Sequence, residues 1–513
     1  MIESVLSVSP KMVLFSGLGL LVLWLYSSWA KHCHIPGPTI ASISNIPRLV
    51  WSWSGKPHEM QIRLHKKYGK IVRLGPNCIS VGDPQEISKV YGTAANMPKS
   101  DFYRVFQPMV RGHLIQGIFN TQDDALHRAL RRPIAGMYSM TNLVEFEPYV
   151  DTTISFFLDQ LEKLQVGKVC DIGQWLQYFA FDVMGEITFS KRLGFLDEAR
   201  DIEGIIANTA KVSRYGALVG QVPWIDQLWA KNPLVRLLTP EKSSAVVEFA
   251  LARARERKAA QESEKVGMEY NSRDFMSRFF DVKAKGDNIP DHYVTAWATS
   301  NVQAGSDTTA ILLRGILYFL LKHPASLSKL MAELAQARVN GRLSDVVTWK
   351  ESRELPYLDA CIKEAGRLHP AVGLALERVV PKGGAVLCGK TIAAGTVVGI
   401  NAWVAHRDEE VFGADAHEWN PDRWLEDKDR RVAMERCLLT FGSGHRTCLG
   451  KNISYLEIYK LIPTLLTQYE ISLVKDWTVT NHWLAFQTDF QVRLRKRESD
   501  WATTDAAHGD VKV

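Results

Sequence analysis

The stretch Phe441-Gly-Ser-Gly-His-Arg-Thr-Cys-Leu-Gly450 determines how this chain is interpreted. It places one cysteine, Cys448, among glycines and an arginine, directly before a segment with helical periodicity at 451–462. Glycine lets the backbone turn sharply and approach a ligand closely. A helix N-terminus and a nearby cation such as Arg446 stabilise a thiolate. The loop therefore predicts a thiolate presented to a large, flat metal cofactor.

Two simpler interpretations remain open for the loop taken alone. A single cysteine is often only a small buried apolar residue. His445 and Cys448 could also form half of a zinc site, although no second Cys/His pair follows at zinc-ligand spacing. The remaining sequence has to distinguish these alternatives from the cofactor interpretation.

Length and composition indicate a globular protein with a large core. The chain has 513 residues, of which 46% are hydrophobic and 23% charged, and no Ser/Gly linker or internal repeat divides it. We therefore expect one catalytic domain over residues 41–497. The 7 cysteines are scattered and odd in number, which favours a reducing compartment over a disulfide framework. The net charge of +6 suits an anionic membrane surface or an acidic protein partner, and we expect no nucleic acid.

The N-terminal region resembles a membrane anchor. A short segment, 1–11, precedes the uncharged apolar run 12–30, which is long enough to cross a bilayer as a helix. A cleaved signal peptide is the alternative, but it needs a shorter apolar region, a basic start and a small-residue exit. The proline-rich segment 31–40 is then expected to end the helix and act as a hinge. The polar tail 498–513 is expected to be disordered.

Periodicity predicts a mainly α protein with minor β sheets, an α+β class. Residues 71–81 read as a β-hairpin, most of 120–330 as helices, and 372–400 as short strands with glycine turns. One long helix is expected from Asn288 to Lys322. Its middle contains Ala304-Gly-Ser-Asp-Thr-Thr309, where the glycine weakens the helix and the threonines can bond back to carbonyls and open it. A glycine flaw with a surface aspartate is the simpler alternative.

Several of these motifs resemble those of one family. Phe441, Gly444, Arg446, Cys448 and Gly450 match the heme-binding signature of the cytochrome P450 monooxygenases. Residues 304–309 are similar to the family's oxygen-binding motif, and the resemblance extends from the anchor to about residue 490. Within the family, the chain looks most like microsomal members of the fungal pisatin-demethylase-like group. The resemblance implies the cytochrome P450 fold behind one N-terminal transmembrane helix.

The resemblance also implies roles for individual residues. Heme b would be the cofactor, with Cys448 as the axial iron ligand and metal-binding residue. Asp307 and Thr308 would relay protons to dioxygen as the catalytic pair. The remaining expected cofactor-binding residues are Arg446, Arg131, Arg378, His127, Phe441, Gly442, Gly450 and Ala304. Many relatives have Trp where His127 stands, so its role depends on the preserved spacing to Arg131. The cationic cluster 127–132 could also face an acidic electron donor, or simply solvent.

A second set of charges has a structural role in the family. Glu364 and Arg367 are three residues apart on one expected helix, and Arg423 follows in a later turn. By themselves they read as a solvated helix pair and a turn arginine. The resemblance implies that the three charges form a buried triad that supports the cysteine loop. We expect them to be structural and not catalytic.

The implied reaction inserts one oxygen atom from O2 into a lipophilic small molecule, by hydroxylation, epoxidation or oxidative demethylation, in secondary metabolism. Electrons would come from NADPH-cytochrome P450 reductase, with cytochrome b5 as a further candidate donor. The implied location is the endoplasmic reticulum membrane, with a cytosolic catalytic domain. A heme-thiolate isomerase or dehydratase that needs no reductase is one alternative, and a non-catalytic heme-binding protein is another.

Apolar residues in four segments are candidates for the substrate pocket. They are Phe102, Tyr103 and Phe106, then Ala304, then 371–376, and finally 483–486. Each is as compatible with plain core as with a pocket wall. Together they predict an apolar ligand, because small-molecule sites are lined mostly by hydrophobic side chains.

Overall fold

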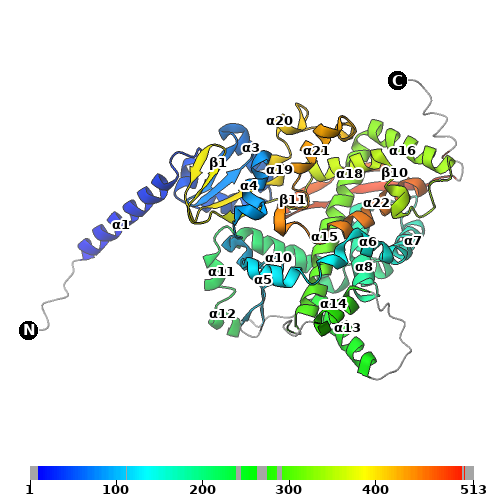
Figure 1. Ribbon diagram of the computed structural model, residues 1–513, viewed down its shortest axis with the longest axis horizontal. Coiled ribbons are helices and arrows are strands. Elements are labelled where there is room, and N and C mark those ends of the chain that lie inside the picture. Colours follow the sequence, from blue (N-terminus) through cyan, green and yellow to red (C-terminus); the bar gives the residue numbers. More distant parts are fainter. Residues whose placement is uncertain are drawn as a thin grey trace, which may run out of the picture.

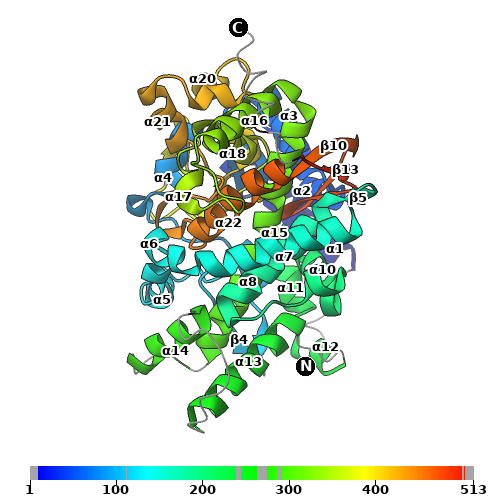
Figure 2. The same cartoon turned by 90° about the vertical axis from the view of Figure 1, so that its right-hand side faces the viewer.

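The structure is a computed structural model that describes residues 10–110, 113–238, 244–262, 274–285, 290, 292–498 and 502. The expected N-terminal segment 1–11 and tail 498–513 lie almost entirely outside this part of the chain. Figure 1 shows a mainly helical body with small sheets, β1 on the side of α1 and β10 on the opposite side, which confirms the mainly α architecture. Figure 2 shows helices α8 and α22 beside the long helix α15, with α7 packed against α8.

The helices are α1 Pro10–Lys31, α2 Ile46–Trp53, α3 Pro57–Tyr68, α4 Ile87–Tyr91, α5 Asp124–Arg131, α6 Met140–Leu143, α7 Glu147–Leu164, α8 Ile172–Phe189, α9 Phe195–Glu198, α10 Ile205–Val219, α11 Trp224–Leu228, α12 Pro233–Leu238, α13 Ala245–Glu262, α14 Phe275–Lys285, α15 His292–Lys322, α16 Pro324–Val339, α17 Trp349–Ser352, α18 Pro356–Leu368, α19 Ala402–Ala405, α20 Glu409–Phe412, α21 Lys428–Arg436 and α22 Lys451–Gln468. The strands are β1 Ile71–Gly75, β2 Cys78–Val81, β3 Met109–Val110, β4 His113–Leu114, β5 Val169–Asp171, β6 Arg378–Val379, β7 Ala385–Leu387, β8 Lys390–Ile392, β9 Val397–Ile400, β10 Tyr469–Lys475, β11 Thr478–His482, β12 Leu484–Thr488 and β13 Gln491–Lys496.

The expected β-hairpin is present as β1 and β2, which pair antiparallel. The largest described sheet has four strands in the order β1-β2-β9-β6. β9 joins β2 in parallel across more than 300 residues of chain, with Ile79 opposite Val398. Local patterns can predict a strand, but a pairing across this separation depends on the tertiary fold.

Helix α15 forms the centre of the core. Its described part begins at His292, so the expected start at Asn288 lies outside the described residues, and it ends at Lys322 as predicted. Gly305 has a packing role that sequence analysis did not predict, because an added Cβ would lie 2.7 Å from Met184 Sδ of α8. The glycine therefore lets α8 approach α15 closely.

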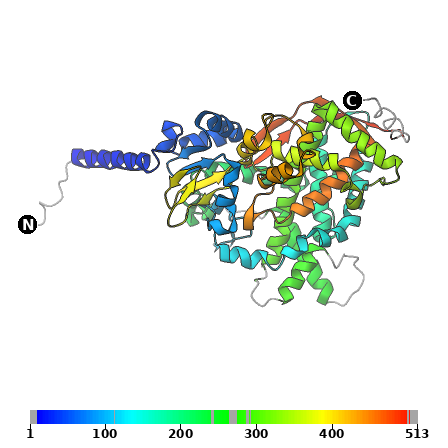
Figure 3. The ribbon, with the colours of Figure 1, turned by 45° about the horizontal axis from the view of Figure 1, so that its top comes forward.

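The N-terminal helix α1 leads away from the rest of the molecule (Figure 3). Phe15, Leu20 and Trp24 on this helix are all more than half exposed, at 69%, 68% and 56%. By length and composition, the described part of the chain holds one helix that could cross a membrane, α15, and 67% of its apolar window is buried in the core.

The segment 31–40 after α1 is held by one buried arginine. Arg73 of β1 donates from Nη1 to the Trp29 carbonyl at 3.0 Å and from Nη2 to the Ser42 carbonyl at 2.9 Å. Its backbone N–H also donates to the Pro36 carbonyl at 2.7 Å. The carbonyls at a helix C-terminus lack partners within the helix, so a cation here both satisfies them and complements the dipole. The segment 31–40 is thus tied to the first sheet.

Candidate active site

The cysteine loop is closed by hydrogen bonds to a single carbonyl. The Cys448 N–H donates to the Phe441 carbonyl at 2.8 Å, and the Thr447 hydroxyl donates to the same oxygen at 3.1 Å. Gly442 and Gly444 have φ angles of 70° and 66°, in the left-handed region that favours glycine. An added Cβ on Gly444 would lie 1.8 Å from the Tyr91 carbonyl oxygen. Both turn geometry and close packing therefore require Gly444.

Cys448 lies just before α22, as the sequence predicted. Its side chain is exposed, although enough protein surrounds the sulfur for burial to raise its pKa. The N–H groups of Gly450 and Lys451 and the positive charge of Arg131 act in the opposite direction and lower it. An accessible sulfur beside free helix N–H groups is suited to bind a metal ion as a thiolate.

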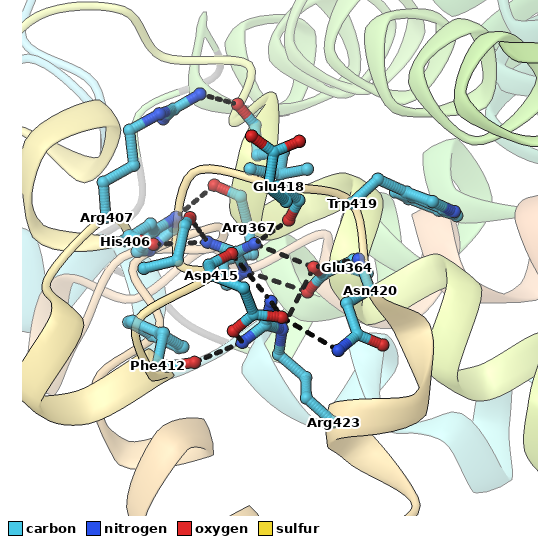
Figure 4. Close-up of polar contacts among 12 residues, drawn as sticks. Glu364, Arg367, His406, Arg407, Phe412, Asp415, Glu418, Trp419, Asn420 and Arg423 are labelled. Carbon is cyan, nitrogen blue, oxygen red and sulfur yellow. Dashed lines mark hydrogen bonds and ion pairs between the residues drawn. The ribbon is translucent and has the colours of Figure 1, made fainter. Parts of the chain in front are cut away.

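Glu364, Arg367 and Arg423 meet in the interior, as Figure 4 shows. Arg367 donates two hydrogen bonds to the Glu364 carboxylate, at 2.7 and 2.8 Å, and Arg423 Nε donates a third at 3.1 Å. The Trp424 Nε1 and Asn420 N–H groups complete the set at 2.9 and 3.0 Å. The three charged side chains are at most 1% exposed. A buried ion set is stable only when every member is paired, and this one is.

His406 links that triad to the cysteine loop, a role that the sequence did not reveal. Figure 4 shows its contact with Arg367. Its Nδ1 donates to the Arg367 carbonyl at 2.9 Å, and its Nε2 accepts the Leu439 N–H at 2.7 Å. Burial lowers the pKa of His406 to about 3, so the ring is neutral and can accept. The Leu439 carbonyl in turn accepts the Gly442 N–H at 2.9 Å. The triad thus reaches the loop through one neutral imidazole.

Three of the predicted arginines lie near the cysteine loop. Arg131 of α5 donates to the Thr447 carbonyl at 2.8 Å. Arg446 binds Asp124, the first residue of α5, at 2.5 Å from Nη2 and 3.1 Å from Nε. Arg378 of β6 lies over the Tyr91 ring, with its guanidinium carbon 4.9 Å from the ring centre.

Lys99 adds a fourth basic side chain that sequence analysis missed. Its ammonium lies 4.1 Å from the Tyr103 ring centre, and the side chain is buried. Burial lowers its pKa well below the usual range, and the charges of Arg378 and Arg446 lower it further. A motif does not mark this lysine, because it comes close to those arginines only through the fold.

The unpaired polar atoms of this region fit a flat dianionic cofactor. Arg446 Nη1 and His127 Nδ1 are buried and have no hydrogen-bond partner among the described residues. Burial and the neighbouring Arg446 lower the pKa of His127 to about 3. Buried donors without partners are costly, and the two carboxylates of a heme would satisfy them. Within the described residues, no group of three or more His, Cys, Asp or Glu side chains could hold a metal ion, so no second zinc half-site accompanies His445.

The predicted relay residues on α15 face different neighbours. Thr308 Oγ1 donates back to the Ala304 carbonyl at 2.7 Å, as expected for this sequence. Thr309 does not bond back, because its hydroxyl instead contacts the Ser454 hydroxyl of α22 at 2.6 Å. Asp307 is 1% exposed and accepts a hydrogen bond from Gln177 Nε2 of α8 at 2.5 Å. Asp307 and Thr308 therefore have no direct contact through these bonds.

Gln177 joins Asp307 to a buried cation. Arg314 Nη2 donates to Gln177 Oε1 at 2.8 Å. Burial raises the pKa of Asp307 from 3.8 to about 6, although the Gln177 hydrogen bond and the Arg314 charge lower it in part. Asp307 Oδ2 has no partner among the described residues. A buried carboxyl group whose pKa lies near neutrality can take up or release a proton under physiological conditions.

The candidate pocket residues form one apolar cluster. Phe102, Tyr103, Leu374 and Trp483 are buried together, with Phe106, Ala371, Val372, Leu376 and Phe486 packed against them. Trp483 has a φ of 76°, unusual for a bulky residue, and its ring centre lies 5.1 Å from that of Phe102. Phe119 also belongs here, 5.9 Å from Trp483, and was not predicted. Ala304, in contrast, lies on α15 outside this cluster.

Comparison with known proteins agrees with the fold. The cytochrome P450 family profile matches residues 35–487, and the chain belongs to this family. A cytochrome P450 monooxygenase of Aspergillus terreus is 50% identical over 470 residues, covering 91% of this chain and 96% of that protein. The cytochrome P450 monooxygenase cicH of Emericella nidulans is 49% identical over 489 residues, covering 94% and 98%. The cytochrome P450 monooxygenase mpaDE of Penicillium roqueforti is 43% identical over 474 residues, covering 90% of this chain and 55% of that longer protein.

Proposed function

We propose that this cytochrome P450 monooxygenase binds heme b with Cys448 Sγ as the axial ligand. The observation that carries the proposal is the loop itself, in which an accessible cysteine precedes α22 and receives N–H groups from Gly450 and Lys451. Phe441 and Gly442 would shape the loop, because the Phe441 carbonyl accepts the Cys448 N–H at 2.8 Å and Gly442 adopts a φ of 70°. Heme supplies the oxygen-activating chemistry when bound, and the protein supplies the ligand, the protons and the placement of substrate.

The propionate groups of the heme would be held by Arg131, Arg378, Arg446 and His127, with Lys99 as an additional hydrogen-bond donor. Guanidinium groups match carboxylate geometry and form strong charge-assisted hydrogen bonds. Asp124 forms an ion pair with Arg446, and each side chain holds the other in its orientation. Gly450 and Ala304 would contribute backbone and space, since an added side chain on Gly450 meets nothing within 4 Å.

In proton delivery, Asp307 and Thr308 would act as two separate proton-transferring side chains. Thr308 is partly exposed, whereas Asp307 is buried beside Gln177. Rotation of the Asp307 carboxyl group, whose Oδ2 has no hydrogen-bond partner in the described part of the chain, would let it exchange a proton between the interior and the Thr308 side of the helix.

The substrate would be a lipophilic small molecule of fungal secondary metabolism, because the Phe102 and Trp483 cluster is apolar and the similar proteins are fungal monooxygenases. Electrons would come from NADPH-cytochrome P450 reductase, with cytochrome b5 as a second donor. Hydroxylation, epoxidation and oxidative demethylation all fit such a site.

The protein would be held at the endoplasmic reticulum membrane by α1. The exposed apolar residues of α1 support this, and so do exposed apolar residues elsewhere at the same end of the molecule (Figure 1). These are Ile46, Val50 and Trp53 of α2, Trp224 and Leu228 of α11, and Leu234, Leu237 and Leu238 of α12. A large exposed apolar surface is typical of a membrane or protein contact.

Reduction by the reductase distinguishes this proposal from a heme-thiolate isomerase or a passive heme-binding protein. The full-length protein is placed in phosphatidylcholine vesicles with NADPH-cytochrome P450 reductase under carbon monoxide, and NADPH is added. A monooxygenase should form the reduced carbonyl complex with NADPH as readily as with dithionite. Formation with dithionite alone would contradict the proposal and favour a reductase-independent enzyme.

A further inference from the structure

A cavity of about 440 Å³ borders the cysteine loop at Phe441, Gly442 and Thr447. Its wall also includes three aromatic side chains that the proposed function does not use, Trp349, Tyr455 and Tyr459. Trp349 and Tyr455 are partly exposed, whereas Tyr459 is buried. The cavity therefore joins the surface of the protein to the outside of the loop that carries Cys448.

The aromatic rings around this cavity form a continuous series. The ring centres are 5.0 Å apart for Phe441 and Tyr455, 5.6 Å for Tyr455 and Tyr459, and 5.4 Å for Tyr459 and Trp349. These are normal contact distances for aromatic pairs. The Phe441 carbonyl accepts the Cys448 N–H, so the series starts within one hydrogen bond of the cysteine backbone.

Tyr459 is paired with a carboxylate. Its hydroxyl donates a hydrogen bond to Asp359, which is also bound by Lys363 Nζ at 2.9 Å and Arg353 Nη1 at 3.1 Å. Burial and the neighbouring Asp359 raise the pKa of Tyr459. Burial opposes ionisation of Asp359, but the Tyr459 hydrogen bond and the Lys363 ammonium outweigh it and lower its pKa. Tyr459 is therefore a neutral phenol that donates a hydrogen bond to the ionised carboxylate of Asp359.

The pairing of Tyr459 with Asp359 determines which aromatic side chain is oxidised most easily. Tyrosine and tryptophan are readily oxidised by one electron, and an oxidised phenol loses its proton. The Arg353 guanidinium lies 4.8 Å from the Tyr459 ring centre and 5.5 Å from a Trp349 ring centre, which makes positive charge on either ring costly. A tyrosyl radical that has given its proton to Asp359 carries no charge, so Tyr459 is favoured over Trp349.

We propose that Phe441, Tyr455 and Tyr459 form a route that carries oxidising equivalents from the cysteine loop to the cavity, with Asp359 as proton acceptor. The inference rests on the proposed function, which supplies the oxidant when oxygen is activated without substrate. Tyr459 would give one electron through the route and its proton to Asp359. A thiol in the cavity would then return one hydrogen atom to the tyrosyl oxygen, and Asp359 would release its proton to solvent. Two such events would convert two thiols to a disulfide and supply the two electrons that, with two protons from solvent, reduce one activated oxygen atom to water.

The test is electron paramagnetic resonance of the substrate-free holoenzyme, freeze-quenched after reaction with peroxide. Wild type should give a tyrosyl signal that narrows when ring-deuterated tyrosine is incorporated. Tyr459→Phe should lose most of that signal, and its heme absorbance should bleach several-fold faster during NADPH turnover with reductase but without substrate. Asp359→Asn should weaken the same signal, because the phenolic proton loses its acceptor.

Tyr318→Phe is the matched control, since Tyr318 also donates to a carboxylate, Asp476 at 3.3 Å, and stacks on Trp477 outside the cavity. It should retain the wild-type signal and bleaching rate. Equal radical yield and bleaching in both tyrosine variants would overturn the inference. The reduced carbon monoxide spectrum, recorded for wild type and each variant, separates this outcome from failure of the proposed function. Absence of the thiolate-type band in wild type would reject the proposed function itself.

Discussion

Gln177 Nε2 of α8 donates a 2.5 Å hydrogen bond to Asp307 Oδ1 of α15, while its Oε1 accepts from Arg314 at 2.8 Å. Arg314 can only donate, so it fixes the orientation of the amide and turns the NH2 group toward Asp307. Gln177 thereby stabilises the ionised form of a carboxyl group that burial otherwise keeps protonated.

Replacing Gln177 by leucine should raise the pKa of Asp307 above about 6, because the hydrogen bond that lowers it is lost. We expect the pH dependence of coupling, measured as hydrogen peroxide formed per NADPH consumed, to move to higher pH. Gln174→Leu, on the exposed face of the same helix, is the control and should keep the wild-type profile. Superimposable profiles for all three proteins would contradict the role of Gln177.

Asp307→Asn should change stability in a pH-dependent way. The folded-state pKa, about 6, lies above the ordinary value of 3.8, so the carboxyl group favours folding when it is protonated. This stabilisation is fully present below the pKa that Asp307 has in the unfolded state. It is lost as the pH rises through the folded-state pKa. A shift of about 2 units corresponds to about 3 kcal/mol, which asparagine avoids because it cannot ionise. Urea unfolding should show the variant gaining stability relative to wild type from about pH 4 to about pH 7; a constant difference would refute the raised pKa.

Thr308 and Thr309 should respond differently to truncation. Thr308→Ala should increase peroxide release per NADPH, because a hydroxyl of the proposed relay is removed. Thr309→Ala should leave coupling unchanged and cost about 1 kcal/mol of stability, because it removes the hydrogen bond to Ser454. Oxygen-electrode and peroxide assays measure the first effect, and urea unfolding the second. Uncoupling by both variants to the same degree would speak against a specific relay role for Thr308.

Arg423→Ala should destabilise the protein strongly. The change leaves Glu364 with one of its two arginines, and breaking a buried ion set typically costs about 3–5 kcal/mol. Arg430→Ala is the comparison, since its ion pair with Glu426 is 43% exposed on both sides and should contribute at most about 1 kcal/mol. For both variants, urea unfolding measures the change in stability, and the rate of heme loss measures the effect on the cysteine loop. Similar losses for the two variants would mean that the triad does not support the loop.

Both α1 and α12 should contribute to membrane association. Removal of residues 1–31 should weaken binding to phosphatidylcholine–phosphatidylserine vesicles. Adding Leu237→Ser and Leu238→Ser should abolish it, because these leucines are 80% and 82% exposed. Val339→Ser, at 52% exposure on α16, is the control and should have no effect. Vesicle sedimentation is the measurement. Full binding by the truncated double variant would contradict the proposed membrane face.

Sequence motifs located the parts of the site that depend on local chain geometry. The spacing from Phe441 to Gly450 predicted the turn before α22, and Gly444 is required there by its φ angle and by the Tyr91 carbonyl. The spacing of Glu364 and Arg367 on one helix turn likewise predicted their pairing. These features need only neighbouring residues and their conformational preferences.

The missed residues reach the site through the tertiary fold. Gln177 lies 130 residues from Asp307, and His406 lies 33 residues from Leu439. Lys99 was missed for the same reason, since its burial beside Arg378 and Arg446 has no local pattern. A buried polar group requires a hydrogen-bond partner. Which residue can supply that partner is determined only when the helices and strands have packed together.

The central claim is that Cys448 binds heme iron as a thiolate, and the carbon monoxide difference spectrum of the dithionite-reduced protein tests it most directly. Wild type should show the red-shifted Soret band that thiolate ligation produces. Cys448→Ala should lose that band, whereas Cys437→Ala, a nearby partly buried cysteine outside the loop, should keep it. An unshifted band in folded wild type, or a red-shifted band that survives Cys448→Ala, would contradict the account.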